Sequence, residues 1–396
     1  CFILVTKGKI PLYYGSSFSY IGAIVGLVGA EKLSSVAILP DADIQIVTFG
    51  IVMSGLISIA AGFLVKKLGR DVIENLLPAT ITGPIAMVIG LTLAGNALAD
   101  AAPAVAGAGF VNNLPWIVSL ATLLATILFS VYLKGFLSQL PLFLGMLFGI
   151  AVAGILSAAT GAVLFRALPE SVAAQGIFAL PHFTLPTVHW GAALAIMPVA
   201  LATIPESTAH IYQLDVYVND LAKKLGSKKK YDLVGELGSN LIGDGVGDMV
   251  AGVMGGPAGT NYGENISAMA ITRVFSVPVL ITAAIIALII ACFTPLVKAI
   301  YSIPISVIGG LEIYLFGAIA AQGIAIMIDK HVDMFSAKNI AVIATIMVIA
   351  LGGHYTFGGM IPFFGAQLPA LSTAAIFGIV LNALLNIGNK SKKKAE

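Results

Sequence analysis

Long apolar runs separated by short polar loops make up most of this chain. A helix that crosses a membrane needs about 20 apolar residues, and ten segments satisfy this requirement. They are residues 43–66, 72–97, 115–134, 138–160, 191–214, 232–254, 277–299, 304–328, 338–353 and 369–388. The pattern therefore predicts an all-α polytopic membrane protein.

Two further apolar stretches are too short to cross as helices. Ser19–Ala30 and Gly263–Val274 each have 12 residues. At about 1.5 Å per residue such a helix is about 18 Å long, little more than half of the hydrocarbon core. We therefore expect two half-helices.

An extended segment precedes each half-helix: KIPLYYGSSF before the first and GGPAGTNY before the second. Both are rich in Gly, Pro and small polar residues, which favour extended chain. Such a backbone cannot face lipid, because its N–H and C=O groups would stay unsatisfied. We predict that the segments pair as a short antiparallel ladder near the midplane. Broken spans at corresponding positions of two halves indicate an inverted repeat with the binding site between them.

Composition supports a membrane protein and excludes several other classes. The chain has 396 residues, of which 58% are hydrophobic and 10% charged, and its mean hydropathy is +1.00. Two cysteines exclude a disulfide scaffold and a cysteine-based zinc site. The net charge of +2 does not indicate a nucleic-acid partner, because the basic residues are spread over short loops, and we expect none. We see no cleavable signal peptide and interpret residues 1–6 as the tail of a truncated helix.

The basic residues predict the orientation of the chain. Counting loops back from the basic tail, only Lys32, Arg166 and Lys298 fall on the opposite side, so 18 of the 21 Lys and Arg residues share one face. The positive-inside rule makes that face cytoplasmic. The predicted location is the inner (cytoplasmic) membrane, with a cytoplasmic C-terminus. The run 228–230 is most simply a topology determinant, and contact with anionic lipid is an alternative.

Two glutamates in apolar segments are the main functional candidates. Glu206 and Glu264 lie at membrane depth, where charge is costly and an acidic residue suggests a function. Their segments offer no nearby Lys or Arg as a partner. His210 follows Glu206 by four residues, so the two share one helix face. Pro205 removes a helix hydrogen bond and is a candidate kink.

The tips of the half-helices suggest what is bound. A helix N-terminus offers free N–H donors and partial positive charge. Phe18 and Tyr262 are placed to pack on a flat ring, and Gly263 allows close approach of the backbone. Carboxylates accept hydrogen bonds from ring N–H groups. The set favours a small, planar, uncharged ligand over an inorganic anion, which the glutamates would repel.

Proton coupling is a hypothesis at this stage. Burial disfavours the charged form of a carboxylate, whereas the helix N-terminus favours it at Glu264, and the sequence does not decide between these effects. Asp244 and Asp248 fit a Gly-rich packing face with capped polar ends or a functional site. Glu312 fits either the transport pathway or an interface.

Three motifs resemble the nucleobase–ascorbate transporter family, and specifically its bacterial uracil-permease branch. They are KGKIPLYYGSSFSYI at 7–21, PESTAH at 205–210 and TNYGENISAMAITRV at 260–274. The resemblance covers the whole chain. It implies 14 transmembrane segments in two inverted repeats of seven, of which the first helix is missing here. It also implies a homodimer.

The resemblance further implies a core and a gate domain. Residues 1–67 and 189–300 would form the core, and residues 68–188 and 301–396 the gate.

The family also implies roles for particular residues. Glu206 would accept hydrogen bonds from the substrate ring, and Glu264 would contact substrate and govern proton coupling. Backbone at Phe18 and Gly263 would meet ring carbonyls, with Tyr262 lining the pocket. His210 would order the Glu206 side and take part in proton coupling, and Phe316 falls where the family has a gate-side aromatic. Ser267 and Pro205 depart from the residues usual in the family.

These arguments predict a proton-coupled uracil symporter rather than an enzyme, with membrane lipid as a further partner. A xanthine or other purine permease and an anion carrier of similar architecture are the alternatives. Glu206, His210 and Glu264 could in principle hold a metal or perform hydrolysis, but no second histidine ligand and no activated Ser or Cys accompany them. We expect no metal and no cofactor beyond the proton. A passive channel is a third possibility.

Overall fold

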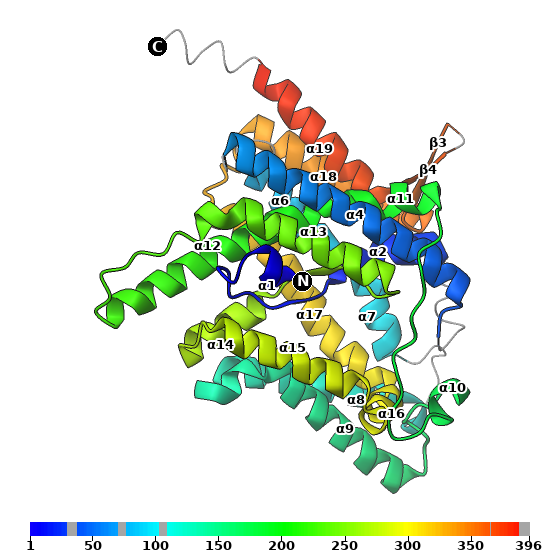
Figure 1. Cartoon of the computed structure of the whole chain (residues 1–396). Coiled ribbons are helices and arrows are strands. Elements are labelled where there is room, and N and C mark those ends of the chain that lie inside the picture. The colour runs from blue at the N-terminus through cyan, green and yellow to red at the C-terminus, as the bar shows by residue number, and fades with distance from the viewer. Residues whose placement is uncertain (30–37, 70–76, 103–108, 365, 388–396) are drawn as a thin grey trace. The chain divides into compact units, whose positions relative to one another are not determined.

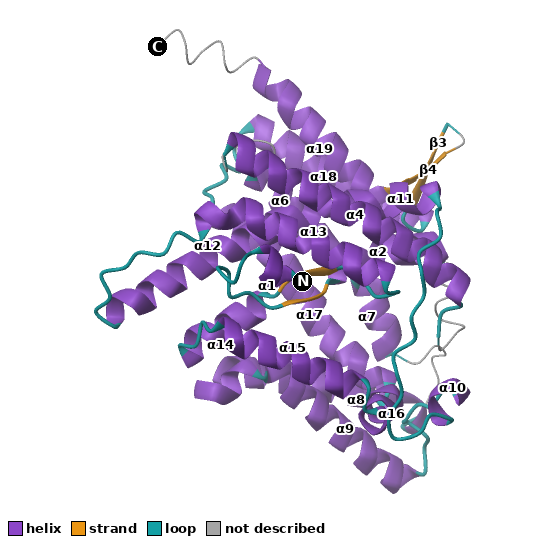
Figure 2. Ribbon diagram, viewed as in Figure 1, coloured by secondary structure: helices purple, strands orange, loops and turns teal. Residues whose placement is uncertain are grey.

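The computed structural model describes residues 1–29, 38–69, 77–102, 109–364 and 366–387. The chain is largely helical (Figure 2). Eight helical segments of the described residues are long and apolar enough to cross a membrane. The chain divides into two compact units, and we describe each by itself. The predicted multi-pass, all-α class is confirmed.

The first unit comprises residues 1–92, 183–277 and 320–396. Its helices before the second unit are α1 (Phe2–Val5), α2 (Ile21–Val28), α4 (Asp41–Leu68) and α6 (Ala79–Thr92). Those that follow are α11 (Trp190–Ile196), α12 (Ala200–Lys224), α13 (Leu237–Val253), α14 (Gly263–Thr272), the end of α17 (Ile305–Asp329), α18 (Ala337–Phe357) and α19 (Ala370–Ile387). Its strands are β1 (Tyr14–Ser16), β2 (Gly259–Asn261), β3 (Met360–Phe363) and β4 (Ala366–Pro369), and its 3-10 turns are η1 (Phe18–Tyr20), η4 (Met197–Val199) and η5 (Val234–Glu236).

The second unit comprises residues 93–182 and 278–319. It contains α7 (Ala94–Ala101), η2 (Val111–Asn113), α8 (Leu114–Tyr132), η3 (Gly135–Gln139), α9 (Pro141–Thr160), α10 (Glu170–Ala173), nearly all of α15 (Val277–Ala291), α16 (Thr294–Ser302) and the first part of α17. Val118 and Ala153 pack with Ile303 and Val307 in its apolar core. Whether the predicted core and gate domains divide the chain as proposed stays a prediction.

The predicted antiparallel ladder is confirmed. Strands β1 and β2 pair antiparallel, with Tyr14 opposite Asn261, Gly15 opposite Thr260 and Ser16 opposite Gly259. Figure 2 shows the two short strands beside α1. The ladder satisfies the backbone of both interrupted spans, as the absence of water at membrane depth requires.

Both half-helices are also confirmed, at slightly shorter lengths. After η1, helix α2 ends at Val28, and Gly29 follows with φ +94°. Helix α14 ends at Thr272, because Arg273 adopts the left-handed conformation with φ +57°. Tyr20, Val47, Ile51 and Ile196 are buried in the core against which α2 packs.

Helices α4 and α13 approach each other closely through glycines. A Cβ added to Gly55 would lie 2.5 Å from the carbonyl oxygen of Gly245, and one added to Gly245 would lie 2.3 Å from that of Gly55. Gly62 and Gly238 meet in the same way. Small residues let membrane helices pack backbone to backbone. The glycines of the Gly-rich span therefore serve helix packing, which was one of the two interpretations that the sequence allowed for this span.

Several predicted boundaries need correction. The segment 277–299 is not one helix, because α15 ends at Ala291 and α16 begins at Thr294. Between them the backbone of Phe293 forms a bridge with Phe178. The helix predicted at 72–97 ends at Thr92, and its residues 72–76 lie outside the described part. The loop after α18 contains an unpredicted hairpin, in which β3 pairs with β4.

The span predicted at 191–214 is interrupted and longer than expected. A 3-10 turn at Met197–Val199, which contains Pro198, separates α11 from α12. Helix α12 then continues through Pro205 to Lys224 (Figure 1). The interruption of this span therefore lies about two turns before Pro205, the residue that the sequence offered as a candidate kink.

Candidate functional site

The ladder holds the first residues of both half-helices close together. Its three paired residues cover only about 7 Å of strand. Helix η1–α2 leaves the end of β1, and α14 leaves the end of β2. Two backbone hydrogen bonds extend the pairing: Tyr262 N–H donates to Tyr13 O at 3.1 Å, and Ser17 N–H donates to Ala258 O at 2.9 Å. All six predicted substrate-binding residues lie in the first unit.

Tyr262 lies across the first strand. Its hydroxyl donates to Ser16 O at 2.8 Å and is 3.2 Å from Ser16 Oγ. A Cβ on Gly15 would meet the Tyr262 ring at 2.7 Å. Only glycine therefore allows the ring to lie on the strand, and the ring is held by both broken spans.

Gly263 and His210 are in close contact. A Cβ on Gly263 would lie 2.9 Å from His210 Nε2. The imidazole hydrogen-bonds the backbone of Asn261, while its Nδ1 is buried without a partner among the residues that the structure describes. The absence of a side chain at position 263 thus lets the histidine reach the first turn of α14.

Glu206 lies half-buried on α12, one turn before His210. It is close enough to interact electrostatically with Asp244. Phe18 begins η1 and is 42% exposed, so its ring is accessible beside the tip of the first half-helix. Glu264 occupies the first turn of α14, and its side chain lies outside the described part of the structure.

A buried polar network fixes the ladder from behind. Asn261 Nδ2 donates to Ser207 Oγ at 3.1 Å, to Asn240 Oδ1 at 3.1 Å and to Asp244 Oδ2 at 3.2 Å. The Ser207 hydroxyl also donates to Asp244. Strand β2 is thereby bonded to α13 and to the residue that follows Glu206.

Asp248 bonds both strands at once. Its Oδ1 accepts from the Tyr14 hydroxyl at 2.5 Å and from Gly259 N–H at 2.7 Å. Its Oδ2 accepts from the Tyr20 hydroxyl at 3.4 Å, and that hydroxyl lies 2.8 Å from Ser54 Oγ. Around Asp244 and Asp248 the enclosed space leaves no room for a water molecule. This network is a packed support for the ladder.

The sequence left Asp244 and Asp248 undecided. No local pattern in the sequence signals the role of Asp248, because its partners Tyr14 and Tyr20 lie 234 and 228 residues away along the chain. A Cβ on Gly247 or Gly259 would meet the Tyr14 ring at 2.7 Å or 2.3 Å. The ring therefore needs both glycines, and its hydroxyl then reaches Asp248.

The remaining candidates lie in the second unit. Phe316 is 3% exposed on α17. Glu312, on the same helix, hydrogen-bonds Asp100. The gate role of Phe316 stays a prediction. Within the described residues, no group of three or more His, Cys, Asp and Glu side chains could hold a metal ion.

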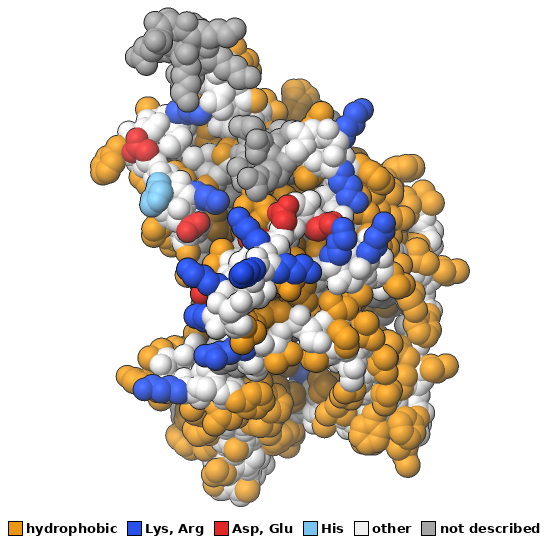
Figure 3. Space-filling model, turned by 60° about the vertical axis from the view of Figure 1, so that its left-hand side comes forward, with side chains coloured by type: hydrophobic (Ala, Val, Ile, Leu, Met, Phe, Trp, Pro, Cys, Tyr) orange, Lys and Arg blue, Asp and Glu red, His pale blue; other side chains and the backbone are white. Residues whose placement is uncertain are grey.

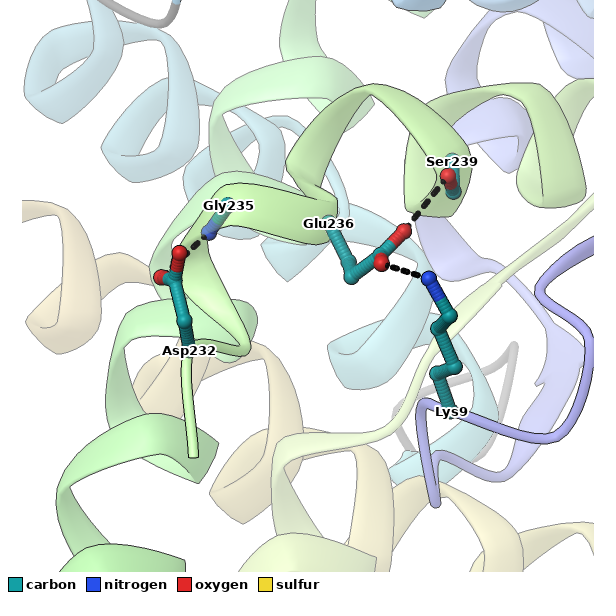
Figure 4. Close-up of polar contacts among 5 residues, drawn as sticks. All are labelled: Lys9, Asp232, Gly235, Glu236 and Ser239. Atoms are coloured by element: carbon teal, nitrogen blue, oxygen red, sulfur yellow. Dashed lines mark hydrogen bonds and ion pairs between the residues drawn. The ribbon is translucent and has the colours of Figure 1, made fainter. Parts of the chain in front are cut away.

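An ion pair ties the segment before β1 to the start of α13. The side chains of Lys9 and Glu236 form this pair, and Ser239 Oγ donates to the same carboxylate at 2.9 Å (Figure 4). Asp232 accepts from Gly235 N–H at 2.9 Å. Helix α13 begins at Leu237, so Glu236 lies just before it. The hydrogen bond from Lys9 lowers the pKa of Glu236.

Comparison with protein families finds one matching model, described as a permease family, over residues 1–359. A uracil permease of Bacillus caldolyticus is 35% identical over 392 residues, covering 97% of this chain and 82% of that protein. A uracil permease of Escherichia coli K12 is 34% identical over 388 residues, covering 98% and 82%. A protein described as the putative pyrimidine permease RutG of the same strain is 31% identical over 388 residues, covering 97% and 80%.

Two solved structures are similar in fold. The transmembrane domain of the cyanobacterial bicarbonate transporter BicA matches with a TM-score of 0.54 at 16% identity, covering 95% of this chain and 85% of that one. SLC26A9 matches with a TM-score of 0.57 at 13% identity, covering 98% and 62%. At such low identity the likeness concerns the fold alone.

Proposed function

Because this chain belongs to the nucleobase–ascorbate transporter family, we propose that it imports uracil across the cytoplasmic membrane by proton symport. The family consists of permeases, so the chain is a transporter rather than an enzyme, as its sequence predicted. The uracil permeases among its relatives support a pyrimidine base as the substrate. In this proposal alternating access moves a core domain against a gate domain, the halves form an inverted repeat, and two copies form a homodimer.

The observation that carries the proposal is the ladder with its two half-helix tips. In this proposal the backbone N–H groups of both tips face a common region, where they suit the carbonyl oxygens of uracil. The Glu206 carboxylate accepts hydrogen bonds from the ring N–H groups. Phe18 and Tyr262 supply aromatic faces for the ring. The ligand is uncharged, so the acidic residues do not repel it.

Proton coupling is assigned to Glu264 and His210. His210 contacts the first turn of α14 through Gly263, and Glu264 is the next residue along the chain. A proton on either residue would alter the charge beside the substrate, so binding of the two would be linked. The proton is the coupling ion in this proposal, and transport needs no cofactor. The basic loops orient the chain with its C-terminus in the cytoplasm.

A transport assay in proteoliposomes tests this function. We expect radiolabelled uracil to accumulate against its gradient when the interior is alkaline, and to stop accumulating after a protonophore is added. Accumulation unaffected by the protonophore would contradict proton symport, and equilibration without accumulation would indicate a channel. Complete displacement of uracil by equimolar xanthine would assign the chain to the purine permeases.

A Glu264→Gln variant separates coupling from binding. We expect it to bind uracil but to lose proton-driven accumulation, because the neutral amide cannot exchange a proton. The matched control is Glu170→Gln, which changes an exposed glutamate in α10. Accumulation at the wild-type level in Glu264→Gln would remove this residue from the coupling mechanism.

A further inference from the structure

An apolar groove of about 360 Å³ opens at the end of α12. Its lining comes from α12, from the segment before α13, from the chain around the start of α15 and from the segment before β1, which contributes Gly8, Lys9 and Pro11. The apolar side chains of the lining include Val218, Leu221, Leu225, Leu233, Phe275 and Val277. All of these residues belong to the first unit. Leu225 is 75% exposed, so the groove reaches the surface of the unit.

Three consecutive lysines lie in the loop between two segments that line this groove, the end of α12 and Tyr231. Lys228, Lys229 and Lys230 are exposed in the loop that follows α12. The ammonium of Lys229 lies 4.9 Å from the ring centroid of Tyr231, and Tyr231 is part of the groove lining. Figure 3 shows the face that carries the end of α12, where Lys and Arg side chains gather next to apolar surface.

The acidic residues nearby are engaged with other groups. Glu236 pairs with Lys9, and Asp232 bonds the backbone of Gly235 (Figure 4). Asp220 pairs with Lys224 on α12. Among the residues that the structure describes, the ion pairs of these acids do not involve Lys228–Lys230, and the three lysines together outweigh the single negative charge of Asp232 at the mouth of the groove.

We propose that this groove binds an anionic phospholipid. One acyl chain lies against Leu221 and Leu225, and the headgroup phosphate meets Lys228–Lys230. Both parts of the site are needed, because an apolar groove alone does not select charge and surface lysines alone do not select a lipid. Basic pockets between membrane helices are suited to acidic headgroups, and each Lys near the surface adds attraction.

Other occupants fit this groove less well. The C-terminal segment carries Lys390, Lys392, Lys393 and Lys394, so its charge has the same sign as that of the rim. A nucleobase is polar throughout and would leave its hydrogen-bonding groups unpaired against the apolar lining. An acyl chain with a negatively charged headgroup matches both the lining and the rim. The inference does not depend on which substrate is transported.

Native mass spectrometry of the purified protein with added lipids tests the proposal. We expect retention of phosphatidylglycerol over phosphatidylcholine, and at least about tenfold weaker retention in the variant K228Q/K229Q/K230Q. Leu225→Trp fills the mouth of the groove without removing charge, and we expect it to weaken retention as well. The control K67Q/K134Q removes two exposed charges that do not line the groove, and it should bind lipid as the wild type does.

Four results would overturn the proposal. The first is equal loss of lipid in the control and in the triple lysine variant, which would reduce the effect to general surface charge. The second is retention unchanged by Leu225→Trp, which would remove the acyl-chain groove. The third is displacement of phosphatidylglycerol by an equimolar amount of glycerol phosphate, which would make the site one for a free phosphate. The fourth is a cross-link between the C-terminal tail and the thiol of a Leu225→Cys variant, which would assign the groove to the tail instead.

Discussion

The two interrupted spans share a ladder but begin their helices differently. At the first, Ser17 caps the turn, because its Oγ accepts from Ser19 N–H at 3.3 Å. At the second, Tyr262 occupies the cap position without a side-chain cap hydrogen bond, and Gly263 brings the backbone against His210. The first tip therefore satisfies one of its own donors with a side chain, whereas the described side chains provide no such cap at the second. From this difference we predict that α14 contributes more to substrate recognition than α2.

The largest effect should come from giving the second tip a side chain. We expect Gly263→Ala to weaken uracil binding about 100-fold, equivalent to about 2.7 kcal/mol, because the new methyl group displaces the His210 ring. Equilibrium binding of radiolabelled uracil measures the change. The matched control is Gly22→Ala in the first half-helix, where an added Cβ meets nothing within 4 Å. Equal losses in both variants would remove the difference between the two tips.

The second-largest effect should come from the Asp248 network, which supports both strands of the ladder. Tyr14→Phe removes the 2.5 Å hydrogen bond to Asp248 and should lower the free energy of unfolding by about 2 kcal/mol, because a buried carboxylate loses a donor. Thermal unfolding in detergent measures this change. Tyr231→Phe is the control, since its ring lies at the surface. If both variants unfold like the wild type, the network does not stabilise the ladder.

Loss of the cap at the first tip should be a smaller effect. Ser17→Ala removes the bond to Ser19 N–H and should cost about 1 kcal/mol of stability. The loss of uracil binding in Ser17→Ala should be smaller than the loss in Gly263→Ala. The reason is that the first tip already uses one of its N–H donors in a bond to its own side chain. A loss of uracil binding as large as that of Gly263→Ala would place the two tips on an equal footing.

The smallest effect concerns the ion pair between Lys9 and Glu236. Lys9 precedes β1, and Glu236 precedes α13, so the pair lies outside both half-helix tips. Because Lys9 lowers the pKa of Glu236 in the folded protein, the pair contributes stability above the unfolded pKa, and this stability is lost as the pH falls through the folded pKa. For a partly exposed pair we expect about 0.5 kcal/mol, lost between about pH 5 and pH 3. Lys9→Gln should flatten this part of the stability profile. A profile unchanged by the substitution would show that the pair contributes nothing.

The sequence predicted those parts of the fold that are dictated by the lack of water in the membrane interior. The short apolar stretches and the Gly- and Pro-rich segments before them were enough to predict the ladder, because unpaired backbone at membrane depth requires a partner. The break between α15 and α16 was not predictable in this way, since Cys292 and Phe293 continue the apolar run. The break arises where Phe293 pairs with Phe178, a contact distant in sequence.

From the sequence, the candidate site residues could be chosen where they are unusual at membrane depth, and their roles in binding stay predictions. Glu206 and His210 stood out because charge and polarity are rare there, and both lie on the helix beside the ladder. The network of Asp248 with Tyr14 and Tyr20 depends on hydrogen bonds between three segments distant in sequence, so the spacing within any one segment could not predict it. The interaction of Glu206 with Asp244 likewise joins two segments distant in sequence, so it could not be predicted from spacing either.

Equilibrium binding of uracil to Glu206→Ala tests the central claim most directly. The claim is that the paired strands hold two helix tips beside this carboxylate, so that together they bind a nucleobase. We predict that Glu206→Ala abolishes binding while its thermal unfolding matches that of the wild type. Glu170→Ala serves as the control and should bind uracil normally. Wild-type affinity in folded Glu206→Ala would contradict the account.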